Sequence, residues 1–570
     1  MRPPASLTLL IALCVVHAGP AIASNILRSK FVRSFPHVFE HAPSSSSPDS
    51  DTASTRILDF ATVHGIGDQD TNSFLGIPYA QPPIGDLRLN VPVPIAEYNG
   101  TINATVSGNW CYSFVPADLP ASPTWLTAEQ ATFFNKFDVP SGVQFSEDCL
   151  NLNVIAPASA KPGSNLPVVA YIFFGAFDFG GATGVDGRKI VKRSVEMNEP
   201  VVFVSMNHRL GPLGWLGGKD VRDAKVGNLG LQDQRTALRW IQRYVRNFGG
   251  DPTKVTLLGF SSGALSAGFH TVYNDDENLF RALWIESGAI QPVGWIDGSN
   301  PQAAYDTYSA SVGCGNATDT LACIRHAPLE AVTNTSAVNA SWSPRADGSV
   351  LLDLPQKLLT EGRARNVPVV AGNAEDEGTL FALNTPNITS DAEFIQALLA
   401  SSWFGNLSAP QGPQLLDLYP NDPALGAPYG TGDDFQYGQM HKRFASVMGD
   451  VNVDANRRLF LREMSKKENV WSYFYRRRKI PGFGSTHGSE VPDMYQAVGS
   501  QLQDLFIHFV NTLDPSGTPG IAQAWPKYNV SAPVLLEFSG NSTLRLKNDT
   551  YREEPIDFLI NLGQKYPWTV

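Results

Sequence analysis

The residues that could do chemistry centre on a serine flanked by glycines. Gly259-Phe260-Ser261-Ser262-Gly263 has the spacing G-x-S-x-G, with an apolar run before it and small residues after it. This context predicts that Ser261 lies on a sharp turn from a strand into a helix, where glycine on either side relieves crowding. The Ser262 amide would then lie at a helix N-terminus. The pattern predicts a nucleophilic serine.

A serine hydroxyl attacks a carbonyl only when a base takes its proton and a third group orients that base. In strand–turn–helix sites both partners follow the serine in the chain. Five histidines do so: His270, His326, His441, His487 and His508. His270 and His508 lie in helical patterns and are predicted to be structural. His487 lies in a glycine-rich stretch after an apolar run, so we predict it as the base.

The candidate acids lie in residues 372–381, after another apolar run. Glu375, Asp376 and Glu377 are consecutive there. A plain acidic surface loop is the alternative interpretation. Because three neighbouring carboxylates cannot all face one imidazole, the residues themselves leave the choice among the three open.

An oxyanion hole requires backbone amides on a loop of small residues after an early strand. Residues 173–182 contain such a loop, and its Gly175 and Ala176 amides, with that of Ser262, are the predicted donors. Phenylalanines crowd the same region, which predicts an apolar site for short, branched or aromatic acyl groups. They are Phe173, Phe174, Phe177, Phe179 and Phe260.

The elements that must position these groups alternate between strand and helix. Apolar runs predict strands at residues 166–174, 200–206, 254–260, 281–285, 367–371 and 470–475. Helical spacing predicts a helix at 229–248, closed by Gly249-Gly250. This order implies an α/β fold with a mainly parallel sheet covered by helices on both faces. The long stretches between later strands are predicted to be insertions that build a cap or gorge.

Charge and the N-terminal pattern bear on where this fold acts. The 570 residues carry a formal net charge of −11, which argues against a nucleic-acid partner. Residues 1–23 have the basic, apolar and small-x-small pattern of a secretory signal peptide. Residues 24–55 are predicted to be a polar, mobile segment and 56–570 the folded domain. No other apolar stretch is long enough to span a membrane.

Ten N-x-[ST] sequons agree with secretion and predict a glycosylated surface. They are Asn99, Asn103, Asn316, Asn334, Asn339, Asn387, Asn406, Asn529, Asn541 and Asn548.

Four cysteines remain once Cys14 leaves with the signal peptide, and they predict two disulfides with three possible connectivities. These are Cys111, Cys149, Cys314 and Cys323. No histidine lies at ligand spacing near them, so we expect no metal, and no cofactor motif is present.

Several stretches together resemble the type-B carboxylesterases, the group that includes cholinesterases and fungal lipases. They are residues 74–83, 146–154, 207–212, 227–234 and 248–252. The resemblance implies an α/β-hydrolase fold from residue 56 to the end, Glu377 as the acid and His487 as the base. It also implies the nearest-neighbour disulfides, Cys111–Cys149 and Cys314–Cys323. With Glu377 as the acid, amide substitutions at Glu375 and Asp376 are expected to be mild.

The chain departs from this family at the site itself. Phe260 stands where the family usually has glutamate, and Ser262 where it has alanine. The oxyanion loop, usually H-G-G-G-F, reads F-F-G-A-F at residues 173–177. The choline-site tryptophan motif is not recognisable.

The sequence thus predicts a secreted serine hydrolase that cleaves carboxylic esters, with a small-molecule or lipid ester as substrate. One alternative is a triacylglycerol lipase whose Cys111–Cys149 loop is a mobile lid: Thr127 to Gln130 resembles a capping box, and the helix it would start has an apolar side. That side comprises Leu126, Phe133, Phe134 and Phe137. A proline-rich entry at residues 119–123 favours a fixed wall instead. The other alternative is a non-catalytic binding protein on the same fold. The oligomeric state stays open.

Overall fold

The computed structural model describes residues 52–114, 127, 129–130, 139–140, 142–338, 340–383, 388–401, 404, 411–540 and 542–568. The predicted signal peptide and Leu126, Phe133, Phe134 and Phe137 of the lid lie outside these residues. So do the sequons at Asn339, Asn387, Asn406 and Asn541.

One large sheet runs through the described part of the chain. Its thirteen strands follow the order β1-β2-β3-β5-β7-β6-β8-β9-β10-β11-β12-β13, and β4 pairs with β2. The strands are β1 (Thr52–Leu58), β2 (Phe60–Gly67), β3 (Thr71–Pro78), β4 (Asn99–Asn103), β5 (Asn151–Pro157), β6 (Leu166–Ile172), β7 (Val202–Met206), β8 (Gly250–Phe260), β9 (Ala282–Glu286), β10 (Val369–Ala374), β11 (Val470–Tyr475), β12 (Val534–Ser539) and β13 (Thr543–Asn548). From β7 to β12 every neighbouring pair is parallel, while the pairs β1–β2, β2–β3, β3–β5, β5–β7 and β12–β13 are antiparallel.

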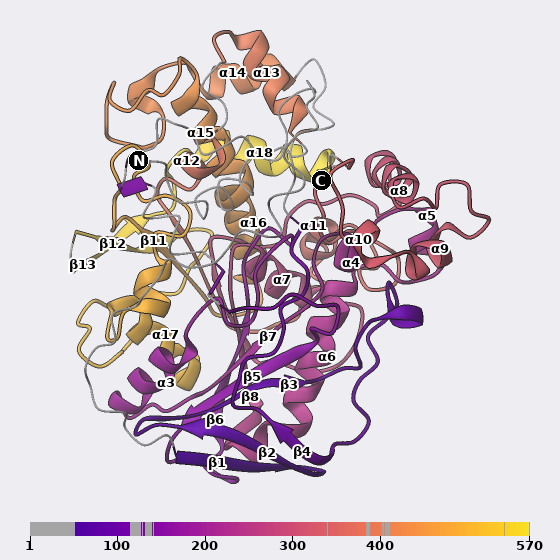
Figure 1. The fold of residues 1–570 in the computed structure, drawn as a ribbon. Helices are drawn as coiled ribbons and strands as arrows, with labels where there is room; N and C mark the ends of the chain where they lie inside the picture. The colour runs from indigo at the N-terminus through magenta and orange to yellow at the C-terminus, as the bar shows by residue number, and fades with distance from the viewer. Residues whose placement is uncertain are drawn as a thin grey trace.

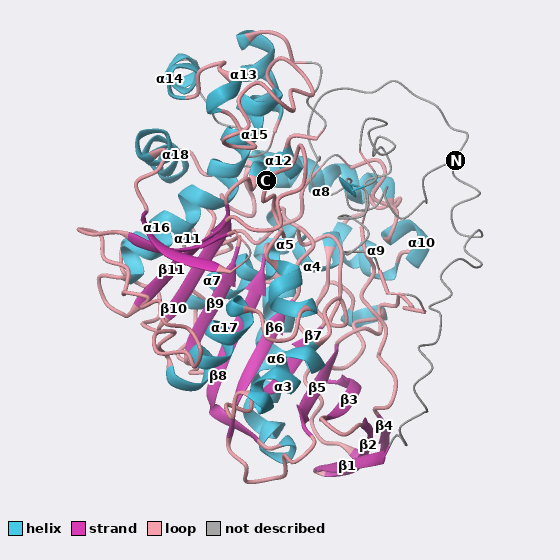
Figure 2. Ribbon diagram, turned by 90° about the vertical axis from the view of Figure 1, so that its left-hand side faces the viewer, coloured by secondary structure: helices cyan, strands magenta, loops and turns pink. Residues whose placement is uncertain are grey.

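Helices cover both faces of this sheet. The α-helices are α3 (Gly187–Glu196), α4 (Gly211–Trp215), α5 (Lys219–Asp223), α6 (Leu229–Tyr244), α7 (Ser262–Thr271), α8 (Ser299–Ser311), α9 (Thr320–His326), α10 (Leu329–Val332), α11 (Pro355–Thr360), α12 (Gly378–Phe381), α13 (Asp391–Ala400), α14 (Gln411–Leu418), α15 (His441–Gly449), α16 (Ala455–Met464), α17 (Gln501–Thr512) and α18 (Glu553–Lys565). Figure 1 shows α3 and α17 on one side of the strands and α6 and α7 on the other. In Figure 2 the strands fan from β1 to β11, and α13, α14 and α15 stand beyond one end of the sheet.

The six strands predicted from apolar runs are all present, as β6 to β11, with ends displaced by a few residues. Strands β7, β9, β10 and β11 are buried at every position, which explains why each is mostly apolar and does not alternate with polar residues. The predicted helix at 229–248 is α6 followed by a 3₁₀ turn, Val245–Phe248, and it ends at Gly249 with a φ of 91°. The parallel core of the prediction is confirmed.

The antiparallel edges were not predicted. The sequence placed the start of the folded domain at residue 56, but β1 begins at Thr52 and pairs with β2 along its whole length. Residues 52–55, predicted to be part of the mobile segment, therefore belong to the sheet, because their backbone groups find partners in β2.

Both disulfides have the pairing that the resemblance implied, Cys111–Cys149 and Cys314–Cys323. In the loop between the first pair, Thr127 and Gln130 form the predicted reciprocal cap: Thr127 N donates to Gln130 Oε1 (2.8 Å) and Gln130 N to Thr127 Oγ1 (3.2 Å). Gln130 is buried, and its Nε2 donates to Pro481 O at 2.9 Å. This part of the loop is anchored to the segment that precedes His487.

Six sequon asparagines fall within the described residues, and all are exposed to solvent: Asn99, Asn103, Asn316, Asn334, Asn529 and Asn548. No helix of the described residues is long and apolar enough to cross a lipid bilayer.

Candidate active site

Ser261 lies on a strained turn where β8 ends and α7 begins. Its φ of 54° and ψ of −125° are rare for a residue with a side chain. A Cβ on Gly263 would meet Ile172 O at 2.1 Å, and one on Gly259 would meet Gly263 O at 2.4 Å. The two glycines are therefore required by close backbone approach, as the spacing predicted.

Ser261, His487 and Glu377 form one hydrogen-bonded row. Ser261 Oγ lies 2.9 Å from His487 Nε2, and His487 Nδ1 lies 2.6 Å from Glu377 Oε2. With neutral imidazole, the Nδ1–H donates to the carboxylate and Nε2 is left to accept the serine proton. Glu377 and His487 are 1% and 8% exposed, whereas Ser261 is partly accessible.

The three neighbouring carboxylates face three different partners. Glu375 forms ion pairs with Arg476 and Lys479, each at 2.7 Å. Asp376 accepts backbone N–H bonds from Tyr429 (2.7 Å) and Ser485 (2.8 Å). Of the three carboxylates, only Glu377 bonds the imidazole, a choice that the residues alone left open. Burial raises the pKa of Asp376 to about 7.

A second carboxyl group lies behind the acid. Ser287 Oγ is 2.6 Å from Glu377 Oε1 and 2.5 Å from Glu490 Oε1. One hydroxyl donates a single proton, so one of the two carboxyl groups must carry a proton, and we assign it to Glu490, which leaves Ser287 to donate to Glu377. Burial, together with the charge of Glu377, raises the pKa of Glu490 well above its usual value, which agrees with this assignment.

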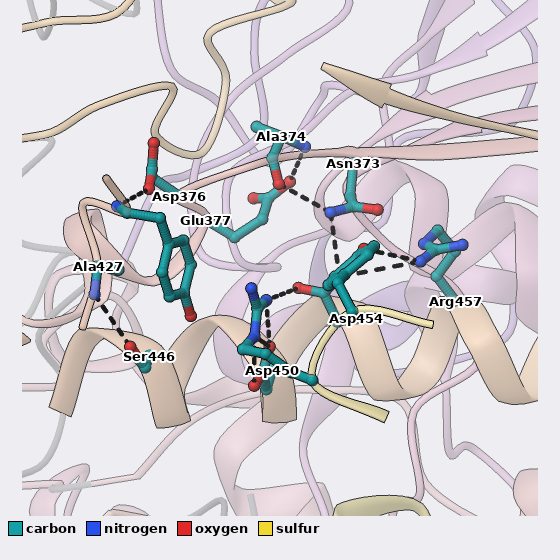
Figure 3. A network of polar contacts seen from close by, with 12 residues as sticks. Asn373, Ala374, Asp376, Glu377, Ala427, Ser446, Asp450, Asp454 and Arg457 are labelled. Atoms are coloured by element: carbon teal, nitrogen blue, oxygen red, sulfur yellow. Dashed lines mark hydrogen bonds and ion pairs between the residues drawn. The ribbon is translucent and has the colours of Figure 1, made fainter. Parts of the chain in front are cut away.

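A buried polar network supports the loop that carries Glu377 (Figure 3). Ala374 N donates to Glu377 Oε1 at 2.6 Å, and Asn373 Nδ2 donates to Ala374 O (2.7 Å) and Asp454 Oδ1 (3.2 Å). Asp454 lies in a π-helical turn, Asp450–Asp454, between α15 and α16. Glu377 is thus linked through Ala374 and Asn373 to a helical turn more than seventy residues further along the chain.

The oxyanion loop follows β6 and is strained as well. Gly175, Ala176 and Phe177 have φ values of 128°, 52° and 67°. None of the amides of Gly175, Ala176 and Ser262 donates to an acceptor within the part of the chain that the structure describes. Three backbone donors near the end of β8 are therefore available to an oxygen of a ligand.

Two of the other histidines and four of the five predicted pocket phenylalanines pack within the fold, whereas His326 is exposed. His270 and His508 bond Gln234 and Glu199 from within α7 and α17, as expected of structural residues. Phe173 stacks on His208 at 4.3 Å, and Phe177 packs on Trp215 at 4.8 Å between ring centroids. Phe174 and Phe260 pack on each other at 5.3 Å.

Comparison with known proteins identifies the family. The model of the carboxylesterase family matches residues 53–559. The chain belongs to the carboxylesterase family. It is a carboxylic ester hydrolase with an α/β-hydrolase fold.

Fungal lipases are among the similar members of this carboxylesterase family. Lipase 4 of Diutina rugosa is 35% identical over 85% of this chain and 90% of its own length. Secreted lipase 1 of Botryotinia fuckeliana is 33% identical over 89% of this chain and 92% of its own length. Among solved structures, EstA of Aspergillus niger aligns with a TM-score of 0.75 at 24% identity, over 90% of this chain and 99% of that one, and supports the fold.

Ser287 and Glu490 of this carboxylesterase were not predicted from the sequence. A weak signal existed for each, because Ser287 directly follows β9 and polar residues at the carboxyl ends of parallel strands often serve a site. Glu490 lies three residues after His487. Neither signal identified a partner, since Ser287 and Glu490 are 203 residues apart in the chain.

Proposed function

We propose that this chain is a secreted serine hydrolase that cleaves carboxylic esters through an acyl-enzyme, with Ser261 as nucleophile, His487 as base and Glu377 as acid. The observation that carries the proposal is the hydrogen-bonded row from Ser261 Oγ through the imidazole to Glu377. Secretion is supported by the signal-like N-terminus and by the secreted relatives in the family.

In the first half-reaction Ser261 Oγ forms a bond to the ester carbonyl carbon while its proton passes to His487 Nε2. The carbonyl oxygen becomes an oxyanion, which accepts hydrogen bonds from the amides of Gly175, Ala176 and Ser262. Glu377 stabilises the imidazolium through Nδ1, at 2.6 Å. The C–O bond to the alcohol then breaks, and the alcohol leaves with the proton held by His487.

In the second half-reaction water replaces the alcohol. His487 takes a proton from the water as its oxygen attacks the acyl carbon. The second oxyanion collapses, the bond to Ser261 Oγ breaks, and the serine regains its proton from the imidazolium. The products are a carboxylic acid and an unmodified enzyme.

The matched test uses the two adjacent serines. Ser261→Ala should lower kcat on p-nitrophenyl butyrate by about 10⁴ to 10⁶-fold, because the nucleophile is removed. Ser262→Ala keeps the backbone amide and should retain most activity. Equal losses in the two variants, or an active Ser261→Ala enzyme, would reject Ser261 as the nucleophile.

A triacylglycerol lipase is the narrower candidate, favoured by the lipase names of relatives such as the secreted triacylglycerol lipase LIP1 of Gibberella zeae, 31% identical. If the Cys111–Cys149 loop covers the site in water and opens at a lipid surface, activity on a short-chain ester should jump at the solubility limit. A smooth saturation curve through that limit favours a carboxylesterase with a fixed wall.

The non-catalytic alternative predicts no turnover at all. A folded wild-type chain that is inactive on a panel of esters of different acyl length would support a binding protein. The same panel tests the expected preference for short, branched or aromatic acyl groups: Phe174→Gly should extend the range of acyl lengths accepted.

A further inference from the structure

Two phenylalanine rings pack against the imidazole of His487. Its centroid is 4.8 Å from that of Phe260, with 31° between the ring planes, and 5.1 Å from that of Phe381, with 49° between the planes. Phe260 is the last residue of β8 and directly precedes Ser261. Phe381 ends α12, the short helix that begins directly after Glu377. One ring is therefore fixed to the nucleophile and the other to the acid.

Phe260 also contacts the oxyanion loop. Its ring packs edge-to-face on that of Phe174, the residue before Gly175, with centroids 5.3 Å apart. Phe260 is 2% exposed, so solvent does not compete for either contact. A single side chain thus contacts both the base and the loop whose amides would bind the oxyanion.

The rings of Phe260 and Phe381 give the imidazole of His487 an aromatic environment. Among the described residues, Glu377 is the carboxylate that bonds His487 Nδ1, while burial raises the pKa of Glu490, which contacts Ser287 on the far side of Glu377. The last residue of β8 and the last residue of α12 each place a phenylalanine ring beside the imidazole. An aromatic face attracts a cation within about 6 Å of its centroid.

We infer that Phe260, with Phe381, is a positioning residue that holds the His487 ring in plane with its two partners and stabilises the imidazolium formed in each half-reaction. The inference rests on the proposed function, because it assigns this role only to a histidine that takes the serine proton. A ring that tilts loses its hydrogen bond to Ser261 or to Glu377, and a cation that loses an aromatic face is less stable.

The test compares Phe260→Leu with Phe260→Glu and with a control. Leucine keeps apolar volume but removes the aromatic face, whereas glutamate adds a carboxylate. Phe248→Leu is the control: Phe248 is a buried ring in the 3₁₀ turn that precedes β8, where it packs on Phe74 with 5.0 Å between ring centroids. The readouts are kcat, KM and the pH dependence of kcat/KM on p-nitrophenyl butyrate.

For Phe260→Leu we expect kcat to fall roughly tenfold with KM unchanged, and the acidic limb of the profile to move to lower pH by roughly half a unit. Phe260→Glu should move that limb to higher pH, because an added carboxylate favours the imidazolium. Phe248→Leu should move neither. Phe381→Leu, at a half-buried position, should repeat the result of Phe260→Leu and keeps the test decisive if the latter does not fold.

A limb that does not move in the leucine variants, or a fall in kcat no larger than in Phe248→Leu, overturns the inference. The wild-type enzyme separates this result from failure of the proposed function. An inactive wild type rejects the proposed function. An active wild type whose leucine variants keep its kcat and pH profile rejects only the role of Phe260 and Phe381.

Discussion

The two halves of the candidate site are positioned in different ways. On the nucleophile side, Ser261 and the oxyanion loop are held by backbone geometry: positive φ angles and glycines against which another main chain packs. On the base and acid side, His487 and Glu377 are held by buried polar side chains from distant parts of the chain. A local backbone conformation is specified by a few adjacent residues, whereas a network of polar side chains forms only when distant parts of the chain have folded together.

Among the changes that test this contrast, the largest loss of kcat is expected from disturbing the backbone conformation around Ser261. In Gly263→Ala the added Cβ would lie 2.1 Å from Ile172 O, so the start of α7 must move away from β6. A displacement of about 1 Å at the nucleophile costs roughly 10²-fold in kcat. Gly268→Ala, in the same helix but with a nearest atom at 3.1 Å, is the matched control and should be milder. Equal activities in the two variants would show that the turn tolerates a side chain.

A smaller effect is expected on the polar side from Asp376→Asn. Asp376 accepts N–H bonds from Tyr429 and Ser485, and Ser485 lies two residues before His487. An amide turns an NH₂ group towards one of these donors, at a cost of about 1–3 kcal/mol, which we expect to appear as roughly a tenfold loss of kcat.

The matched variant is Glu375→Gln, a neighbouring buried carboxylate that pairs with Arg476 and Lys479 instead. The sequence alone predicts mild effects at both positions, whereas the structure predicts a clear difference in kcat between them. If Asp376→Asn is as active as Glu375→Gln, the contact between the two loops does not position the base.

The smallest effect on activity is expected at Glu286, which lies beneath the site at the end of β9. Burial raises its pKa to about 8, and Tyr495 and Trp284 donate to it. Because its folded pKa lies above the ordinary value near 4.5, its protonated form stabilises the fold at low pH, and this contribution is lost as pH rises from about 4.5 to 8.

Glu286→Gln should therefore flatten the decline in the free energy of unfolding across that window, where each pKa unit is worth about 1.4 kcal/mol. Chemical denaturation at pH 5 and pH 8 measures the change, with the exposed Glu97→Gln as control. If the free energy of unfolding of Glu286→Gln differs from that of the wild type by the same amount at pH 5 and pH 8, the pKa of Glu286 does not change on folding.

The same contrast explains what the sequence could predict. Ser261 and its glycines, the Thr127–Gln130 cap and the buried parallel strands are local patterns, and each is present. Ser287 and Glu490 depend on contacts across 90 and 203 residues, which no local pattern specifies. Strands β1 to β5, β12 and β13 were not predicted. They lie on either side of the parallel core, in the parts of the sheet that contain its antiparallel pairs, where the partner strand, more than the residues, decides the conformation.

The most direct test of the account is to locate the nucleophile chemically. A fluorophosphonate probe should add one phosphonyl group per folded chain. Trypsin then releases residues 255–281, which contain Ser261, Ser262 and Ser266. We predict that fragmentation of this peptide places the adduct on Ser261, and that His487→Ala slows labelling greatly because the hydroxyl loses its base. A folded chain that stays unlabelled, or an adduct on another residue, would contradict the proposed mechanism.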